Sequence, residues 1–149
     1  MIPRLHPALH RLLFEVTLAS PLARDLGIRL VSASADETVL AMPFQPRMVT
    51  FGDVIHGGVV ATLIDIAGAA AFVAGADPAL EGGATSAMAI SYLAPARSVD
   101  LLATARILRR GRTQTVSEIA VTGGARLVAK AMVTSIGFQR SELKVCVQN

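Results

Sequence analysis

The chain has 149 residues, of which 52% are apolar and 17% are charged, and its formal net charge is +3. This length suits one domain with a real core, and this composition excludes intrinsic disorder, which requires low hydrophobicity and high net charge. The small positive charge and the 4% aromatic content disfavour a nucleic-acid binder, and the single cysteine, Cys146, excludes a disulfide framework.

The N-terminal segment, residues 1–26, has a helical pattern. Apolar residues recur at roughly helical spacing, at Leu5, Leu9, Leu12, Leu13, Val16 and Leu18. They predict an amphipathic helix over Pro7–Leu18, and Ser20-Pro21 predicts the start of a second short helix that stops near Gly27. Charged and histidine side chains interrupt this segment, so it does not resemble a secretory signal and we expect a cytoplasmic protein.

The pattern then changes to the alternation typical of strands. Ile28–Ser34 and Glu37–Phe44 are predicted strands joined by a turn at Ala35-Asp36, and Gln45–Ile55 is a predicted loop. In the second strand one face carries Thr38, Leu40, Met42 and Phe44.

The stretch Gly57–Ala76 is long enough to span a membrane and contains one charge, Asp65. A charge near the middle of a span costs about 2.5–3.5 kcal/mol, and the stretch is mostly alanine and glycine without flanking lysine or arginine. We therefore interpret it as a long helix, ending near Ala74, that is covered by protein on all sides.

The rest of the chain is predicted to form four strands: Ala84–Leu93, Val99–Leu108, Gln114–Thr122 and Leu127–Phe138. The Arg109–Arg112 segment is a predicted hairpin turn and Gly123-Gly124 a second turn, while Gly75–Gly83 is a loop. The polar tail, residues 139–149, is predicted to be loosely held.

This order of elements predicts an α+β fold in which an antiparallel sheet lies against one central helix, all within a single domain over residues 1–149. The mean hydropathy of +0.54 is high for a small protein. A subunit interface would bury the excess apolar surface, so we expect a homo-oligomer, a dimer or a dimer of dimers.

Two glycines, Gly57 and Gly58, stand where the loop turns into the long helix. The first N–H groups of a helix lack partners and lie at its positive end, so they can polarise a carbonyl oxygen. Asp65 could supply water or attack a carbonyl, but it lies eight residues on, about 12 Å along the helix axis. If the two groups cooperate, Asp65 must come from a neighbouring subunit.

Each of these candidate residues also has a purely structural interpretation. Asp65 could pair with an arginine or face water at a subunit edge, and His56 could cap the helix rather than move a proton. His6 and His10 have a spacing that can bind metal, but no third ligand is evident, and no metal site is expected.

Several motifs together resemble one family. They are His56-Gly57-Gly58 followed by an apolar helix with Asp65, the Tyr92-Leu93-Ala94-Pro95-Ala96 segment, and Gly111-Arg112. In combination the chain resembles the hotdog-fold acyl-CoA thioesterases of the phenylacetate-degradation (PaaI-like) type over roughly residues 21–138. The resemblance implies an antiparallel sheet wrapped around the helix, with an active site at the dimer interface.

The resemblance also implies roles for particular residues. The Gly57 N–H would polarise the thioester carbonyl, and Asp65 of the opposite subunit would be the general base or nucleophile. The third catalytic residue, His56, would shape the loop and help position the thioester. Thr85 would orient the attacking water, unless it is only a strand residue. The residues expected to bind substrate are Thr50, Gly58, Tyr92, Arg109, Arg110, Gly111 and Arg112, the last four meeting coenzyme A phosphates unless they form only an exposed hairpin.

The predicted function is hydrolysis of an acyl-CoA to free acid and CoA, without metal or redox cofactor. The chain departs from the family pattern at Thr50, where asparagine is common, and at Ala87 and Ala89, where polar residues are frequent. These departures support an alternative function, a non-catalytic hotdog protein that binds acyl-CoA as a sensor or sequestering module.

Overall fold

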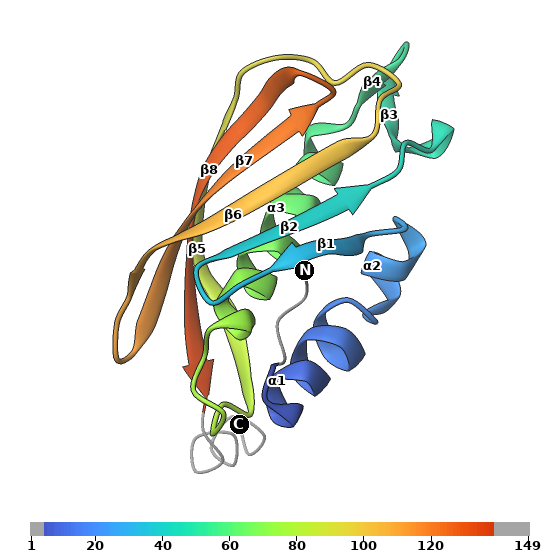
Figure 1. Cartoon of the computed structure of the whole chain (residues 1–149). Coiled ribbons are helices and arrows are strands. Elements are labelled where there is room, and N and C mark those ends of the chain that lie inside the picture. The colour runs from blue at the N-terminus through green and yellow to red at the C-terminus, as the bar shows by residue number, and fades with distance from the viewer. Residues whose placement is uncertain (1–4, 139–149) are drawn as a thin grey trace, which may run out of the picture.

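The computed structural model describes residues 5–138 (Figure 1), and the predicted tail with Cys146 lies outside the described residues. An antiparallel sheet has the strand order β1-β2-β6-β7-β8-β5. Its strands are β1 (Arg29–Ala33), β2 (Glu37–Met42), β5 (Gly82–Tyr92), β6 (Leu101–Arg110), β7 (Gln114–Gly123) and β8 (Arg126–Phe138). The long helix α3 (Gly57–Ala74) lies against one face of this sheet, as predicted.

Alternation along the strands builds the core between the sheet and α3. Every second residue is buried in β2, in the first half of β6 and in β7 as far as Val121, among them Thr38, Leu40, Leu101, Ala103, Ile119 and Val121. The helix packs closely on β8 at Gly68, where an added Cβ would lie 2.8 Å from Cγ1 of Val133. Only glycine permits that approach, so the small residues of α3 bring it down onto the sheet.

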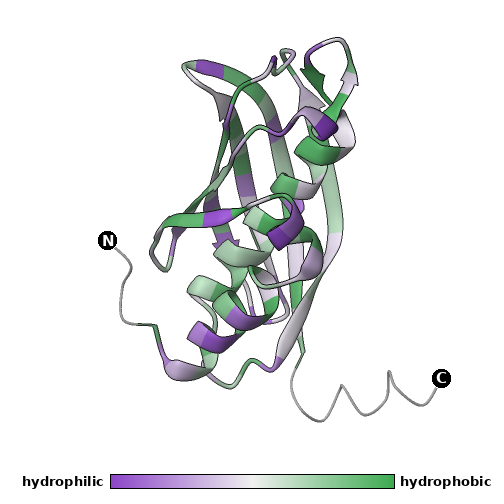
Figure 2. Cartoon of the chain, turned by 90° about the vertical axis from the view of Figure 1, so that its right-hand side faces the viewer, coloured by the Kyte–Doolittle hydropathy of each residue, from purple (hydrophilic) through white to green (hydrophobic). Residues whose placement is uncertain are grey.

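Helix α3 is apolar on most of its surface (Figure 2), and its length and hydropathy would suffice to cross a membrane. In this fold 61% of that 18-residue window is buried inside the protein. The helix contacts β2, β5, β6, β7 and β8, as the core helix of a folded domain does. The one charged residue of the helix, Asp65, is only half-buried.

The predicted helix Pro7–Leu18 is helical, but only its first half is an α-helix, α1 (Pro7–Arg11). The second half is a π-helix, η1 (Leu12–Thr17), in which the Leu18 N–H donates to the Leu13 carbonyl oxygen. A short helix α2 (Pro21–Asp25) follows and confirms the Ser20-Pro21 start. The Ser20 hydroxyl does not cap α2, because it donates to the Thr17 carbonyl oxygen.

The predicted loop Gln45–Ile55 is more ordered than expected. It contains a short 3-10 helix, η2 (Pro46–Met48), and a small hairpin of β3 (Val49–Phe51) and β4 (Val54–Ile55). The His56 N–H donates to the Met48 carbonyl oxygen, so the hairpin holds the chain where α3 begins. At its start, Phe44 lies beyond the end of β2, so the prediction that it belongs to that strand was wrong.

The predicted turn Arg109–Arg112 was wrong at its first two residues. Arg109 and Arg110 belong to β6, where they pair with Val116 and Thr115 of β7. The strand accommodates their charges because Arg109 is exposed and Arg110 donates to backbone carbonyl oxygens at the end of α3. The turn itself begins at Gly111. The second turn likewise begins one residue later than predicted, since Gly123 is the last residue of β7.

Candidate active site

Two side chains form hydrogen bonds with the first turn of α3. Nδ1 of His56 accepts a hydrogen bond of 2.8 Å from the Gly58 N–H, which makes His56 the N-cap of the helix. The Tyr92 hydroxyl donates to the Gly57 carbonyl oxygen at 3.0 Å. Among the described residues the Gly57 N–H has no acceptor. Of the two glycines, Gly57 thus presents a free donor, whereas the Gly58 N–H is already engaged.

Asp65 and Thr85 meet in a pocket on the other side of the helix. The Thr85 hydroxyl donates to Oδ1 of Asp65 at 2.6 Å, and both side chains are half-buried. The pocket around them, here called the Asp65 pocket, has a volume of about 510 Å³. Its other walls include Leu12, Val16, Ala69 and Phe72. A carboxylate and a hydroxyl therefore stand together at the edge of an otherwise mainly apolar cavity.

A β-bulge in β5 lets one strand serve both ends of the site. Thr85 pairs with Ser135 and Ala87 with Thr134, so Ser86 is an extra residue in the ladder. A bulge changes which side chains face a given side of the sheet. Thr85 and Tyr92 are seven residues apart and would face opposite sides of a regular strand, yet both contact α3.

The two halves of the site do not meet within one chain. Thr50, Gly57 and Tyr92 line a separate pocket of about 400 Å³, here called the Gly57 pocket, which shares no residue with the Asp65 pocket. Gly57 and Asp65 lie in one helix, eight residues apart, which separates them by about 12 Å along its axis. One small carbonyl group cannot contact both in the same chain.

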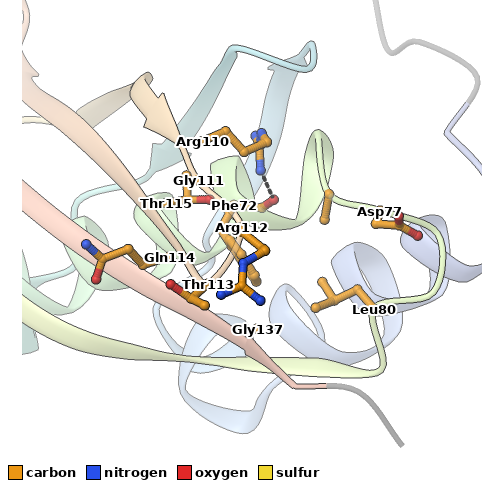
Figure 3. Close-up of a pocket in the computed structure, with 11 residues that line it drawn as sticks. Phe72, Asp77, Leu80, Arg110, Gly111, Arg112, Thr113, Gln114, Thr115 and Gly137 are labelled. Atoms are coloured by element: carbon orange, nitrogen blue, oxygen red, sulfur yellow. Dashed lines mark hydrogen bonds between the residues drawn. The ribbon is translucent and has the colours of Figure 1, made fainter.

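The arginine hairpin forms a third pocket, here called the hairpin pocket, at the far end of α3 (Figure 3). Arg110 points toward that helix end and donates to the carbonyl oxygens of Phe72 at 2.9 Å, Ala71 at 3.3 Å and Ala35 at 3.0 Å. Burial lowers the pKa of its guanidinium. The guanidinium donors of Arg110 thus contact the end of α3, and its predicted contact with coenzyme A phosphate stays a prediction.

The other residues of this predicted turn are placed differently. Gly111 and Arg112 line the hairpin pocket with Asp77 and Gln114, whereas Arg109 is exposed and does not line it. A second bulge, at Leu108, shifts the alternation of β6, so that Arg110 rather than Arg109 faces the helix. Since the ring of Phe72 borders both the Asp65 pocket and the hairpin pocket, the two cavities are neighbours.

Residues 5–138 contain no group of three or more His, Cys, Asp or Glu side chains that could hold a metal ion. Nδ1 of His6 accepts from the Ala8 N–H at 3.3 Å and caps α1. The ring of His10 lies against Phe14, with 4.5 Å between the ring centroids. Both histidines thus have local structural contacts.

The N-terminal helix contributes to the site although no residue of it was a predicted site residue. Leu12 and Val16, together with Thr17, form one wall of the Asp65 pocket. Their i, i+4 spacing was visible in the sequence, but it predicts a core-facing stripe equally well. Nothing local indicates that this stripe faces a cavity, because the opposite wall comes from α3 and β5.

Comparisons with known proteins agree with this architecture. The family model of the thioesterase superfamily matches residues 52–124. The putative esterase VNG_1336C of Halobacterium salinarum is 36% identical over 124 residues, which cover 80% of this chain and 81% of the relative. Acyl-coenzyme A thioesterase 13 of Homo sapiens is 29% identical over 131 residues, covering 85% of this chain and 92% of the relative.

Solved structures share the fold. The PaaI protein of the E. coli phenylacetic acid degradation operon superposes with a TM-score of 0.78 at 24% identity, covering 88% of this chain and 94% of that chain. Zebra fish thioesterase superfamily member 2 gives a TM-score of 0.69 at 27% identity, covering 85% of this chain and 94% of that chain. The sheet wrapped on one long helix is thus the hotdog fold.

The fold is therefore that of the hotdog proteins, and the family match with the sequence relatives gives the class, thioester hydrolases. The chain belongs to the thioesterase superfamily and is a thioester hydrolase.

Proposed function

We propose that this protein hydrolyses acyl-CoA thioesters at a site shared by two subunits. One subunit contributes the Gly57 N–H, and the other contributes Asp65 and Thr85. The observation that carries the proposal is the 2.6 Å hydrogen bond from the Thr85 hydroxyl to Asp65 inside a pocket. A relative over most of the chain is named an acyl-coenzyme A thioesterase, which supports this substrate class.

The start of α3 would activate the thioester. The free Gly57 N–H, at the positive end of the helix dipole, donates to the carbonyl oxygen and stabilises the negative charge that develops there. The His56 cap and the Tyr92 hydroxyl hold the glycine turn from two sides, so the donor is fixed before substrate arrives. A preorganised donor needs no rearrangement during the reaction.

Asp65 would act as the general base. Because the Thr85 hydroxyl donates its proton to Oδ1, its oxygen is left to accept a hydrogen bond from water. The same water can donate to the second carboxylate oxygen. Its oxygen attacks the thioester carbon while Asp65 takes a proton, and collapse of the intermediate breaks the C–S bond. Asp65 then returns the proton to the departing CoA thiolate.

A homodimer or a dimer of dimers would complete the site. Strand β5 is the last strand of the sheet, and its outer edge has no partner strand among residues 5–138. Large apolar side chains are exposed on or near this edge and on the β3–β4 hairpin, among them Met88, Tyr92, Leu93 and Phe51. Pairing two β5 edges would satisfy the free backbone groups and cover apolar surface.

The test is release of CoA thiol from a panel of aliphatic and aromatic acyl-CoAs. Replacing the base by Asp65→Asn keeps the size of the side chain and its hydrogen bond from Thr85 but removes the charge. We expect kcat to fall by about 10²- to 10⁴-fold, as loss of a general base does. Binding of acyl-CoA should remain.

The control is Asp36→Asn, at an exposed turn carboxylate away from the Asp65 pocket, which should leave turnover unchanged. An Asp65→Asn variant as active as the wild type would contradict the role given to Asp65. Binding of acyl-CoA by the wild type without turnover of any ester would instead support the sensor or sequestering function, with Thr50 as the first residue to replace by asparagine.

A further inference from the structure

The Asp65 pocket extends along α3 away from the carboxylate. Asp65, Ala69 and Phe72 all line it and lie on successive turns of the helix. The first and last are seven residues apart, which is about 10 Å along the helix axis. The pocket therefore extends along the helix from Asp65 and Thr85, and three further polar residues, Thr17, Glu81 and Ser135, also line it.

Small residues give this pocket its room. Beside Thr85, the wall that β5 contributes consists of the small residues Gly82, Gly83 and Ala84. At Gly83 an added Cβ would lie 2.7 Å from Cε1 of Phe72, so this position has no space for a side chain. The Phe72 ring closes the end of the pocket away from Asp65, and it is only 8% exposed.

The remaining long wall is the π-helix η1. Its wider turn is held by two hydrogen bonds: the Leu18 N–H donates to the Leu13 carbonyl oxygen at 2.9 Å, and the Thr17 hydroxyl donates to the Leu12 carbonyl oxygen at 3.0 Å. Such turns cost hydrogen-bond geometry and occur frequently at functional sites. Here the turn presents Leu12, Val16 and Thr17 to the pocket.

Val16 is the informative residue of this wall. Its neighbours Leu9 and Leu13 on the same helical segment are buried in the core, at 5% and 0% exposure, whereas Val16 is 55% exposed beside the pocket. An apolar side chain in the wall of an elongated cavity suits an aliphatic ligand. Residues 12–17 also lie outside the family match over 52–124, so the wall is not part of the segment that the family model describes.

We infer that η1 is the acyl-recognition wall of this enzyme and that Val16 determines the acyl chain length it prefers. The thioester carbonyl lies at Asp65 and Thr85, and the acyl chain runs between α3 and η1 toward Phe72. The inference rests on the proposed function, which it deepens by assigning an aliphatic acyl chain and the residue that measures it.

The experiment compares kcat/KM for straight-chain acyl-CoA esters of short, medium and long chain in the wild type, Val16→Phe and Val16→Ala. The larger ring of phenylalanine fills the pocket, so kcat/KM for the longest substrate that the wild type accepts should fall at least about tenfold relative to the shortest. Val16→Ala should shift the preference toward longer chains. Activity on the shortest ester should persist in both variants.

The matched control is Val31→Phe, which makes the same replacement at a 45% exposed valine on edge strand β1, outside the Asp65 pocket. Its chain-length profile should equal that of the wild type. Equal profiles for Val16→Phe and Val31→Phe, with normal thioesterase activity, would overturn the inference while leaving the proposed function intact.

Lack of turnover in the wild type on every ester would contradict the proposed function instead. Calorimetry would then measure the affinities of the same esters for the wild type and Val16→Phe. These affinities test whether η1 recognises the acyl chain. A selective loss of affinity for the longer esters in the variant would support recognition by η1, and unchanged affinities would reject it.

Discussion

His56 shows how one side chain prepares the start of α3. Its Nδ1 accepts the Gly58 N–H at 2.8 Å, which satisfies one of the helix's first donors. The adjacent Gly57 N–H stays available for a ligand oxygen. Because the nitrogen facing the turn is occupied as an acceptor, we interpret His56 as a cap that holds the glycine turn rather than as a proton-transfer group.

A capping role predicts different results for two replacements of His56. Asparagine caps helices well, so His56→Asn should keep stability and most of kcat. Alanine cannot accept the Gly58 N–H, so His56→Ala should lower the free energy of unfolding by about 1 kcal/mol. Urea denaturation and thiol-release kinetics measure the two effects. A folded His56→Asn protein with kcat reduced 100-fold or more would show that the imidazole takes part in the chemistry.

At the scale of elements, two β-bulges direct side chains toward the two ends of α3. The bulge at Ser86 turns both Thr85 and Tyr92 toward the helix. The bulge at Leu108 turns Arg110 inward after a strand whose odd-numbered residues, from Leu101 to Ala105, are the buried ones. Without the second bulge, alternation would direct Arg109 to the helix end instead.

The second bulge therefore leads to a stability prediction. Arg110→Met keeps the apolar stem but leaves the carbonyl oxygens of Phe72, Ala71 and Ala35 without their donor. Unsatisfied, partly buried carbonyls cost about 1–3 kcal/mol, and a positive charge at the helix C-terminus is also lost. We expect the free energy of unfolding to fall by about that amount, measured by urea denaturation.

The neighbouring Arg109→Met is the control for this change, because Arg109 is exposed and, within residues 5–138, does not bond to the helix. It should change the free energy of unfolding by less than about 0.5 kcal/mol. Equal stability of the Arg110→Met and wild-type proteins would show that water replaces the guanidinium at no cost.

At the scale of the whole molecule, the separation of the Gly57 and Asp65 pockets makes assembly part of the proposed mechanism. Each chain carries the Gly57 N–H in one pocket and the Asp65 carboxylate in another, and the two pockets share no residue. In a symmetric dimer the two halves would meet twice, once in each composite site.

Mixed dimers test this arrangement directly. Gly57→Pro removes the N–H at the first position of the helix, where proline is accepted, and Asp65→Asn removes the base. Each variant alone should be inactive. Co-expression with different tags, followed by two affinity steps, isolates the mixed dimer. One of its two sites is intact, so it should show about half of wild-type kcat per dimer.

Gly57→Ala is the control for the first variant, because it retains the N–H and its Cβ would make ordinary contacts of 3.5 Å with the Tyr92 ring. It should retain activity. Inactive mixed dimers, with both parent variants folded, would place Gly57 and Asp65 in one catalytic unit within a chain and reject the shared site.

The sequence alone was sufficient to predict the architecture and the residues at which the long helix begins. Alternation in Glu37–Met42 and Leu101–Ala105 and the long apolar run from Gly57 are local patterns, and burial of apolar surface acts on them directly. They predicted the antiparallel sheet, the central helix and the loop-to-helix glycines. The spacing of Gly57 and Asp65 already indicated that they could not meet within one chain, because helix rise is a constant.

Only the tertiary structure determined which side chains line the Asp65 pocket and which way the arginines of the hairpin point. The bulges at Ser86 and Leu108 depend on cross-strand register, which a single strand's alternation does not contain, so the inward turn of Arg110 was not predictable. The same holds for Val16, whose exposure depends on α3 and β5 standing opposite it. Local spacing determines which face a residue occupies, but what that face meets is determined by packing between distant segments.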